Sequence, residues 1–275
     1  MPTRRANLRI VSWPLDSNSR SFIVSRIIRP NSLQAIVIPY QFGIQLQPAA
    51  MISWLTNNDE IRMNTDLPDL ENIAKVTLAH YDQRADDFRQ GTQDHDVSQN
   101  INALLEHIRG TPPFTILDFG CGPGRDLKTF TDLGHFAIGL EGSPRFAKMA
   151  GEQGFEVWQQ NFLALDLPES KFDGVFANAS LFHVPSLELP RILRELCAAL
   201  KPGGVLFSSN PRGNNEEGWN RGRYGTYHDF DTWRDFLLDA GFVELAHYYR
   251  PAGLPRDQQP WLASVWRKTD SREYG

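Results

Sequence analysis

Cysteine is scarce in this chain, with only Cys121 and Cys197 among 275 residues. Two cysteines provide neither a disulfide framework nor a four-ligand zinc site, so we expect a reducing compartment and no metal. Long apolar runs are also missing, because the longest candidate, residues 33–46, is interrupted by proline, glycine and polar side chains. A membrane span needs about 20 apolar residues. The sequence therefore predicts a soluble protein that does not bind a membrane.

An excess of positive charge is absent as well. The formal net charge is −5, whereas domains that bind nucleic acids are usually basic. Hydrophobic residues make up 41% of the chain and charged residues 22%, which is close to the average of globular domains. The composition thus predicts a folded protein of one or two domains without a nucleic-acid partner.

The first 58 residues differ from the rest, since they hold six arginines, no lysine and one acidic residue, Asp16. Their charge of +5 leaves −10 for the remaining 217 residues. An Arg-rich, Ser-rich and acid-poor start is typical of a transit peptide, although an unfolded extension or a small folded element could share this composition. We predict an unstructured leader over 1–62 and a cytoplasmic location, or a mitochondrial one if the leader is a transit peptide.

Regular patterning begins near Asp69, where two amphipathic helices are expected over 69–81 and 97–108. They form a predicted helical cap over 63–112. From residue 113 to 275, short apolar runs alternate with amphipathic segments, and the last two apolar runs have no helix between them. This order predicts an α/β core with a doubly wound, mostly parallel sheet and one antiparallel strand.

The loop after the first strand of this core carries the strongest functional signal. Residues 118–124 read Asp-Phe-Gly-Cys-Gly-Pro-Gly before a helix, and Glu141 ends the next apolar run. Glycines let the backbone approach a ligand, the helix N-terminus directs amides at it, and an acid such as Glu141 suits ribose hydroxyls. The spacing is not the Gly-x-Gly-x-x-Gly of dinucleotide sites, and no phosphate-binding Gly-Lys-Ser/Thr follows. We therefore expect a ribose-bearing ligand without phosphates.

At these residues the chain resembles the class I S-adenosylmethionine-dependent methyltransferases, especially members that act on small molecules. Residues 172–180 and 200–207 also resemble the fourth-strand motif of that superfamily and the turn into its fifth strand. The resemblance runs from about residue 75 to 268. It implies a Rossmann-like sheet of seven strands in the order 3-2-1-4-5-7-6, with the last strand antiparallel. It also implies S-adenosyl-L-methionine as the cofactor.

The resemblance further implies which residues bind this cofactor. Asp118 and the backbone of 120–124 would hold its methionine part, Glu141 its ribose, and residues near 142–143 and 161–162 its adenine. Asn161 stands where the family often has an acid, and its amide oxygen can still accept the adenine amino hydrogen. The residues expected at the cofactor are Asp118, Gly120, Cys121, Gly122, Gly124, Glu141, Gly142, Ser143, Asn161, Phe162, Asn178, and, from a segment similar to Tyr-Asp-x-x-Ala, Tyr81 and Arg84.

Residues for the methyl acceptor are predicted from position alone. Methyl transfer depends mainly on positioning, and a base is needed only if the acceptor arrives protonated. His183 and His228 are candidate bases. Packing among apolar residues would also account for His183. Asp229 could orient His228 as a base, but it is equally suited to cap a helix. The long segment 210–229 is expected to be a loop that closes over the substrate. Its expected substrate contacts are Arg212, Trp219, Arg223, Tyr224 and Tyr227, and Arg250 at a strand end is one further charge to test.

These features predict methyl transfer to a small polar metabolite. Two alternatives stay open. Methylation of a protein or RNA would need a basic surface, which the negative charge of the core disfavours. A non-catalytic binding module with the same fold would be expected to lose the glycine loop or Glu141, both of which are present. The glycine spacing disfavours a nicotinamide oxidoreductase.

Overall fold

The computed structural model describes residues 22–29, 32–39 and 69–269, in a chain that divides into two compact units, 1–65 and 66–275. In the first unit, β1 (Phe22–Arg29) and β2 (Ser32–Pro39) form an antiparallel hairpin. Their sequences are rich in Ile and Val, which favour strands. This hairpin lies in the segment predicted as an unstructured leader, for which the sequence also left a small folded element open. The other residues of 1–62 lie outside the described part, and for them the prediction stays a prediction.

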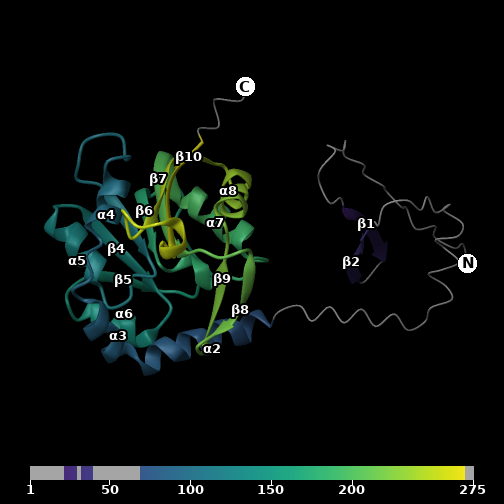
Figure 1. Cartoon of the computed structure of the whole chain (residues 1–275), viewed down its shortest axis with the longest axis horizontal. Helices are drawn as coiled ribbons and strands as arrows, with labels where there is room; N and C mark the ends of the chain where they lie inside the picture. Colours follow the sequence, from purple (N-terminus) through teal and green to yellow (C-terminus); the bar gives the residue numbers. More distant parts are fainter. Residues whose placement is uncertain (1–21, 30–31, 40–68, 270–275) are drawn as a thin grey trace, which may run out of the picture. The chain divides into compact units, whose positions relative to one another are not determined.

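The second unit is built on one seven-stranded sheet (Figure 1). Its strands lie in the order β10-β11-β7-β6-β3-β4-β5, which is 3-2-1-4-5-7-6 when they are numbered along the chain, as predicted. Only β11 runs antiparallel to its neighbours in this sheet. The strands are β3 (Thr115–Phe119), β4 (Phe136–Glu141), β5 (Glu156–Gln159), β6 (Phe172–Asn178), β7 (Leu200–Pro211), β10 (Phe242–Arg250) and β11 (Trp261–Lys268).

Helices cover both faces of this sheet because each presents an apolar stripe to it. On one face, α4 (Ser98–Leu105) and α5 (Arg125–Asp132) bury Ile101, Leu104 and Phe130 against the strands, and α6 (Pro144–Gly151) packs beside them. On the other face, α7 (Leu189–Ala199) and α8 (Phe230–Asp239) bury leucines and Trp233. The sheet is therefore enclosed, and its carboxyl edge stays available for ligands.

Short polar signals fix where several helices begin. Asp69, Ser143 and Asp229 each accept a hydrogen bond from the backbone N–H three residues later, and thereby cap α2 (Leu70–Gln83), α6 and α8. Pro144 follows Ser143 at the first helical position, as the sequence predicted. Asp229 is thus a helix cap, one of the two interpretations that the sequence left open.

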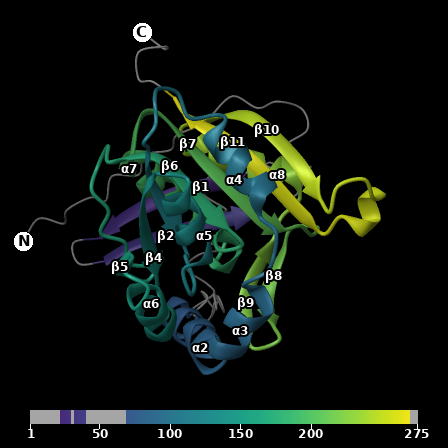
Figure 2. The ribbon, with the colours of Figure 1, turned by 90° about the vertical axis from the view of Figure 1, so that its left-hand side faces the viewer.

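Two helices and a second hairpin lie at the carboxyl edge of the sheet (Figure 2). They are α2, α3 (Ala85–Thr92), and the pair β8 (Glu216–Asn220) and β9 (Arg223–Tyr227). The sequence predicted an open loop over 210–229, and this expectation is wrong. Arg221 and Gly222 both have positive φ, 50° and 85°, which is the geometry of a two-residue hairpin turn. The turn glycine after Asn220-Arg221 was the signal that could have identified the hairpin.

No helix among residues 69–269 is both long enough and apolar enough to cross a membrane.

Candidate active site

A cavity of about 740 Å³ runs along the carboxyl edge of the sheet. Glu141 of β4 lines one end of it, the glycine loop and Asn178 of β6 the middle, and Trp261 and Arg250 the other end. Five strand spacings separate β4 from β10, or roughly 24 Å at the usual distance between strands. The cavity has the size of a small-molecule site and is long enough for two ligands placed end to end.

The glycine loop brings bare backbone to this cavity. Gly120 has a φ of +85° and donates its N–H to the Leu140 carbonyl at 2.8 Å. A Cβ at Gly120 would lie 2.5 Å from the Cβ of Ser180, so no larger residue fits. Gly122, with a φ of +54°, lines the cavity, whereas Gly124 packs tightly against Ala150 of α6. The first two glycines shape the site, and the third serves helix packing.

Glu141 is locked in place by the same loop. Its two carboxylate oxygens accept the backbone N–H groups of Gly122 and Ser143, each at 2.8 Å. Burial raises the pKa of Glu141, and these hydrogen bonds oppose that rise. The carboxyl group is therefore a fixed acceptor at the wall of the cavity.

Asp118 lies beneath the loop and is fully buried. Its Oδ2 atom has no hydrogen-bond partner, and burial, reinforced by Asp126, raises its pKa well above the usual range. A buried carboxyl group of this kind is stabilised in its charged form by a nearby cation. Together with Glu141 it fits a positively charged ligand such as the sulfonium and ammonium groups of the expected cofactor.

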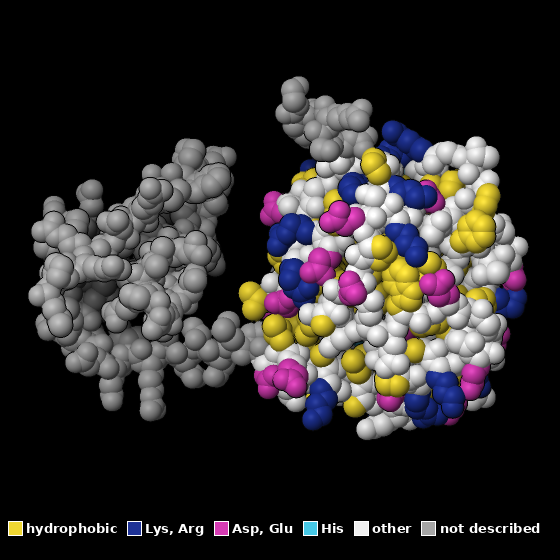
Figure 3. Space-filling model, turned by 180° about the vertical axis from the view of Figure 1, so that it is seen from behind, with side chains coloured by type: hydrophobic (Ala, Val, Ile, Leu, Met, Phe, Trp, Pro, Cys, Tyr) yellow, Lys and Arg dark blue, Asp and Glu magenta, His cyan; other side chains and the backbone are white. Residues whose placement is uncertain are grey.

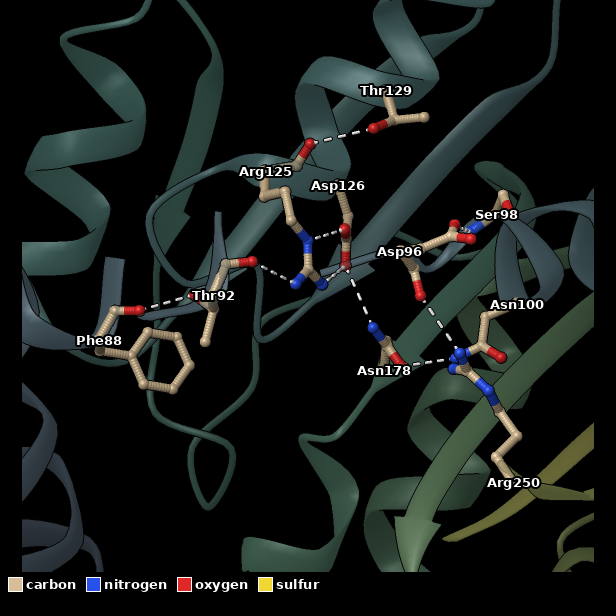
Figure 4. A network of polar contacts seen from close by, with 10 residues as sticks. All are labelled: Phe88, Thr92, Asp96, Ser98, Asn100, Arg125, Asp126, Thr129, Asn178 and Arg250. Atoms are coloured by element: carbon tan, nitrogen blue, oxygen red, sulfur yellow. Dashed lines mark hydrogen bonds and ion pairs between the residues drawn. The ribbon is translucent and has the colours of Figure 1, made fainter. Parts of the chain in front are cut away.

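A polar network holds the middle of the cavity (Figure 4). Arg125 binds both carboxylate oxygens of Asp126, at 2.6 and 2.9 Å, and donates to the Thr92 carbonyl at 3.1 Å. Asn178 donates to Asp126 at 3.3 Å and accepts from Asn100 at 3.0 Å. The network joins α3, α4, α5 and β6, so the Asn178 amide is held in one orientation at the cavity wall.

Aromatic and polar groups form the end of the cavity that is expected to hold adenine. The Phe162 ring lines the cavity and stacks on Phe119, with ring centres 4.2 Å apart. Asn161 also lines it, and its side-chain oxygen accepts the Leu163 N–H at 3.0 Å. This bond occupies one of the two acceptor positions of the amide oxygen, and the second can still serve a ligand.

Tyr81 and His183 form a half-buried pair in the lining of the cavity. The Tyr81 hydroxyl lies 2.7 Å from Nε2 of His183, and Nδ1 of His183 lies 2.6 Å from the Tyr224 carbonyl. A carbonyl only accepts, so Nδ1 carries the proton and Nε2 accepts from Tyr81. Burial lowers the pKa of His183 to about 4 and raises that of Tyr81 to about 12, so both are neutral near pH 7.

Most residues predicted for the cofactor line the cavity, and four do not. Those that line it are Gly120, Cys121, Gly122, Glu141, Gly142, Asn161, Phe162, Asn178 and Tyr81. Asp118, Gly124 and Ser143 support the loop or cap α6 from behind. Arg84 is exposed at the end of α2, where it lies near His80 and away from the cavity lining.

Burial raises the pKa of the Cys121 thiol, which agrees with its having no nucleophilic role.

Among the predicted substrate residues, only Arg223 lines the cavity, with its guanidinium 5.7 Å from the centre of the Tyr81 ring. Trp219 is 50% exposed on the outer side of the hairpin. Tyr224 is buried, and the Tyr227 hydroxyl accepts from Asn220. Arg212 is engaged by the carbonyls of Gln259 and Arg256. These four contribute to the hairpin and to the loop that follows β10, and none of them lines the cavity.

His228 does not line the cavity either. It lies in a small separate hollow with Asn210 and Thr226, and its Nε2 atom is 3.3 Å from the Ser186 hydroxyl. Asp229 binds Asn215 and the start of α8, and so does not orient the imidazole as the sequence interpretation required. This placement speaks against His228 as the base.

Several cavity residues were not predicted from the sequence. Phe88, Asp94, Asp96 and Val97 come from α3 and the segment after it, where sequence patterning gave no functional signal. Trp261, the first residue of β11, also lines the cavity and was not among the predicted site residues. Within residues 69–269, no group of histidine, cysteine, aspartate and glutamate is arranged to hold a metal ion.

Residues 117–208, which hold the glycine loop, Glu141 and Asn178, match the protein family described as a methyltransferase domain. The core is a class I S-adenosylmethionine-dependent methyltransferase fold. The structure of the 1,6-didemethyltoxoflavin-N1-methyltransferase of Burkholderia thailandensis, with S-adenosylhomocysteine bound, is similar at a TM-score of 0.61 and 23% identity, covering 74% of this chain and 92% of that one. A [4+2]-cyclase structure is similar at a TM-score of 0.56, with 18% identity over 71% of this chain and 96% of that one. This methyltransferase fold therefore does not by itself fix the reaction.

Curated relatives match over a limited region. The sterol 24-C-methyltransferase of Gibberella zeae is 26% identical over half of this chain and 41% of its own length. The malonyl-[acyl-carrier protein] O-methyltransferase of Erwinia pyrifoliae is 34% identical over 42% of this chain and 44% of its own. The trans-aconitate 2-methyltransferase of Azoarcus sp. is 32% identical over 41% of this chain and 45% of its own. The chain spans less than half the length of these relatives.

Proposed function

We propose that this protein transfers a methyl group from S-adenosylmethionine to a small polar molecule. The observation that carries the proposal is the single cavity along the sheet edge, because it has the family's motif residues at one end and open length over β6, β7 and β11 beyond them. A cofactor at the first end leaves room for an acceptor at the second. End-to-end placement of the two ligands is what an in-line displacement requires.

The residues of the first end suit the parts of the cofactor. Glu141 offers carboxylate oxygens to the ribose hydroxyls, and Phe162 offers a ring face to the adenine. Asp118 lies below the glycine loop, where a cationic ligand would stabilise the charged form of its buried carboxyl group. When bound, S-adenosylmethionine supplies the electrophilic methyl group on its positively charged sulfur.

His183 and Tyr81 are the groups suited to handle a proton. Neutral His183 presents the lone pair of Nε2 toward Tyr81, and its Nδ1–H is fixed by the Tyr224 carbonyl. An acceptor hydroxyl or amine that replaced the Tyr81 hydroxyl at Nε2 would meet a base that is already oriented. Because the pKa of His183 is about 4, the imidazole would release an accepted proton quickly and would pass it on rather than stay protonated.

A small acceptor is favoured over a macromolecule by the charge of the surface. On the face seen in Figure 3, lysine and arginine side chains are interspersed with aspartate and glutamate and form no continuous basic patch. The relatives include methyltransferases that are named for a sterol, for trans-aconitate and for a malonyl group on a carrier protein. These names support a small acceptor group and leave its identity to experiment.

Calorimetric titration with S-adenosylmethionine, followed by transfer of a labelled methyl group to a metabolite panel, tests the proposal. We expect Glu141→Gln to weaken cofactor binding by at least about tenfold, since a buried hydrogen bond to a charged group contributes roughly 1.5–3 kcal/mol. Glu152→Gln is the matched control, because Glu152 is exposed on α6 and away from the cavity. Failure of the folded wild-type chain to bind the cofactor would refute the proposal. Binding of the cofactor without transfer to any acceptor would favour the non-catalytic binding module. A separate titration with NAD tests the nicotinamide oxidoreductase alternative.

A further inference from the structure

We infer that the far end of the cavity binds an anionic group through Arg250, so that the acceptors are small carboxylates or similar anions. This inference rests on the function proposed above and deepens it by naming the chemical class of the acceptor. It is carried by the position of Arg250, by its lack of a charged partner and by the engagement of the acids around it.

The sheet topology places Arg250 at the acceptor end. Arg250 is the last residue of β10 and pairs with Trp261, the first residue of β11, which in turn pairs with Pro211 at the end of β7. Because β11 is antiparallel, its first residue lies at the same sheet edge as the last residues of the parallel strands. Arg250 and Trp261 therefore line the cavity at the end opposite Glu141.

Arg250 has no ion-pair partner among the described residues, and neither has Arg223, whose guanidinium lies 5.7 Å from the centre of the Tyr81 ring near the other ligand. Arg250 donates one hydrogen bond to the Asp96 carbonyl at 3.2 Å, as Figure 4 shows, and has no carboxylate oxygen within 4.0 Å among the described residues. By contrast, Arg125 and Arg145 pair with Asp126 and Asp86 at 2.6 Å. The remaining guanidinium N–H groups of Arg250 are available to a ligand.

The acidic groups that face this end do not neutralise Arg250. The Asp96 carboxylate accepts the Ser98 N–H at 2.9 Å, and its hydrogen bonds with Ser98 are the main cause that keeps the Asp96 pKa below its usual range, with a smaller contribution from the charge of Arg250. Asp126 is occupied by Arg125 and Asn178. Asp94 also lines the cavity and is exposed, so water and salt screen its charge.

The chemistry of this end fits a carboxylate with an apolar body. A guanidinium matches the two oxygens of a carboxylate, and Arg250 is half-buried, so part of the competing water is excluded. Trp261 adds an aromatic surface next to it. Three strand spacings separate β10 from β6, roughly 14 Å, so an extended anion can place its reactive atom over Asn178 while Arg250 holds the other end.

Three probes of equal shape test the inference on the full chain loaded with S-adenosylhomocysteine: 3-phenylpropionate, 3-phenylpropanamide and 3-phenylpropylamine. We expect the acid to bind at least about tenfold more tightly than the amide, and the amine to bind most weakly. Arg250→Gln should abolish the preference for the acid, and Arg250→Lys should retain part of it. Arg256→Gln is the matched control, since it removes the same charge from a neighbouring residue outside the cavity lining and should leave the preference intact.

The outcomes separate this inference from the proposed function. S-adenosylhomocysteine is titrated first into every variant, and thermal unfolding verifies that each variant is folded. Binding of S-adenosylhomocysteine without a preference for the acid, or an equal loss in Arg250→Gln and Arg256→Gln, would overturn the role of Arg250 alone. Tighter binding of the amine than of the acid would overturn the inference, because it would show that the acidic side chains at the rim, Asp94 and Asp96, select a cationic acceptor. Failure of the wild-type chain to bind S-adenosylhomocysteine would overturn the proposed function together with the inference.

Discussion

Two glycines with almost the same backbone angle serve different purposes in this protein. Gly120 and Gly134 have φ values of +85° and +84°, which side chains rarely adopt. A Cβ at Gly134 would meet nothing within 4 Å, whereas a Cβ at Gly120 would lie 2.5 Å from that of Ser180. At Gly134 only the backbone conformation requires glycine. At Gly120 glycine is also required because Ser180, in the loop after β6, approaches the backbone closely.

Replacing both glycines by alanine separates these two effects. Gly134→Ala should lower the free energy of unfolding by about 1–2 kcal/mol, the cost of a left-handed residue with a side chain. Gly120→Ala should lower it by about 1–3 kcal/mol more, because atoms of the glycine loop or of Ser180 must shift. Urea unfolding of both variants measures the difference. Equal losses would show that the contact with Ser180 is relieved without cost.

At the scale of elements, the hairpin β8–β9 connects parts of the chain that are distant in sequence. The Tyr224 N–H donates to the Thr77 hydroxyl of α2 at 3.0 Å, and the Tyr224 carbonyl accepts from His183 in the short helix η1 (Leu181–His183). Thr226 donates to the Phe182 carbonyl at 3.2 Å. Strand β9 thereby fixes α2 and η1 beside the cavity, and Arg223 at its start lines that cavity.

Thr77→Val should loosen the hairpin without changing the volume of the side chain. The Tyr224 N–H would lose its acceptor in a buried position, which costs about 1–3 kcal/mol. We expect faster hydrogen exchange at Tyr224 by at least about fivefold, and weaker cofactor binding because Tyr81 and His183 lose support. Thr129→Val is the control, since Thr129 bonds only within its own helix at 3.3 Å. Unchanged exchange at Tyr224 would mean that β8 and η1 hold the hairpin alone.

At the scale of the whole molecule, the candidate site belongs to one of the two units. The described residues that line the cavity all lie between Ile73 and Trp261, within the unit 66–275. The charge of the chain is divided in a similar way, with +5 in the first 58 residues and −10 in the rest. The cavity proposed to bind the ligands is thus described within the second unit. The leader's role as a transit peptide or extension stays a prediction, as does the cellular location.

A chain that begins at Asp66 should therefore bind S-adenosylmethionine within about twofold of the full chain, because no described contact of the site is removed. Calorimetry and thermal unfolding of both chains measure this. A loss of binding by a folded 66–275 chain would show that the first unit contributes to the site. Fusing residues 1–65 to a reporter protein tests the transit-peptide interpretation separately.

The sequence by itself determined the fold and the cofactor end of the site. The alternation of strands and helices, the glycine loop and the position of Glu141 follow from patterns within a few residues: apolar runs, capping residues and glycines at turns. Such patterns act locally, since backbone conformation and the burial of one face depend mainly on neighbours in the chain. The strand order was implied by the resemblance to the methyltransferases, and the sheet has that order. The acceptor end lacks such a local pattern, and there the sequence interpretation assigned Arg212, Tyr224 and His228 to roles that their placement does not support.

Only the tertiary structure decided how the acceptor end is built. Tyr81 meets His183 across 102 residues, Thr77 meets Tyr224 across 147, and Arg250 meets Asp96 across 154. Which side chains share a cavity at such separations depends on strand register, on the antiparallel direction of β11 and on hairpin pairing. A shift of one residue in a strand turns a side chain to the opposite face, so the same residue types can line a site or lie outside it.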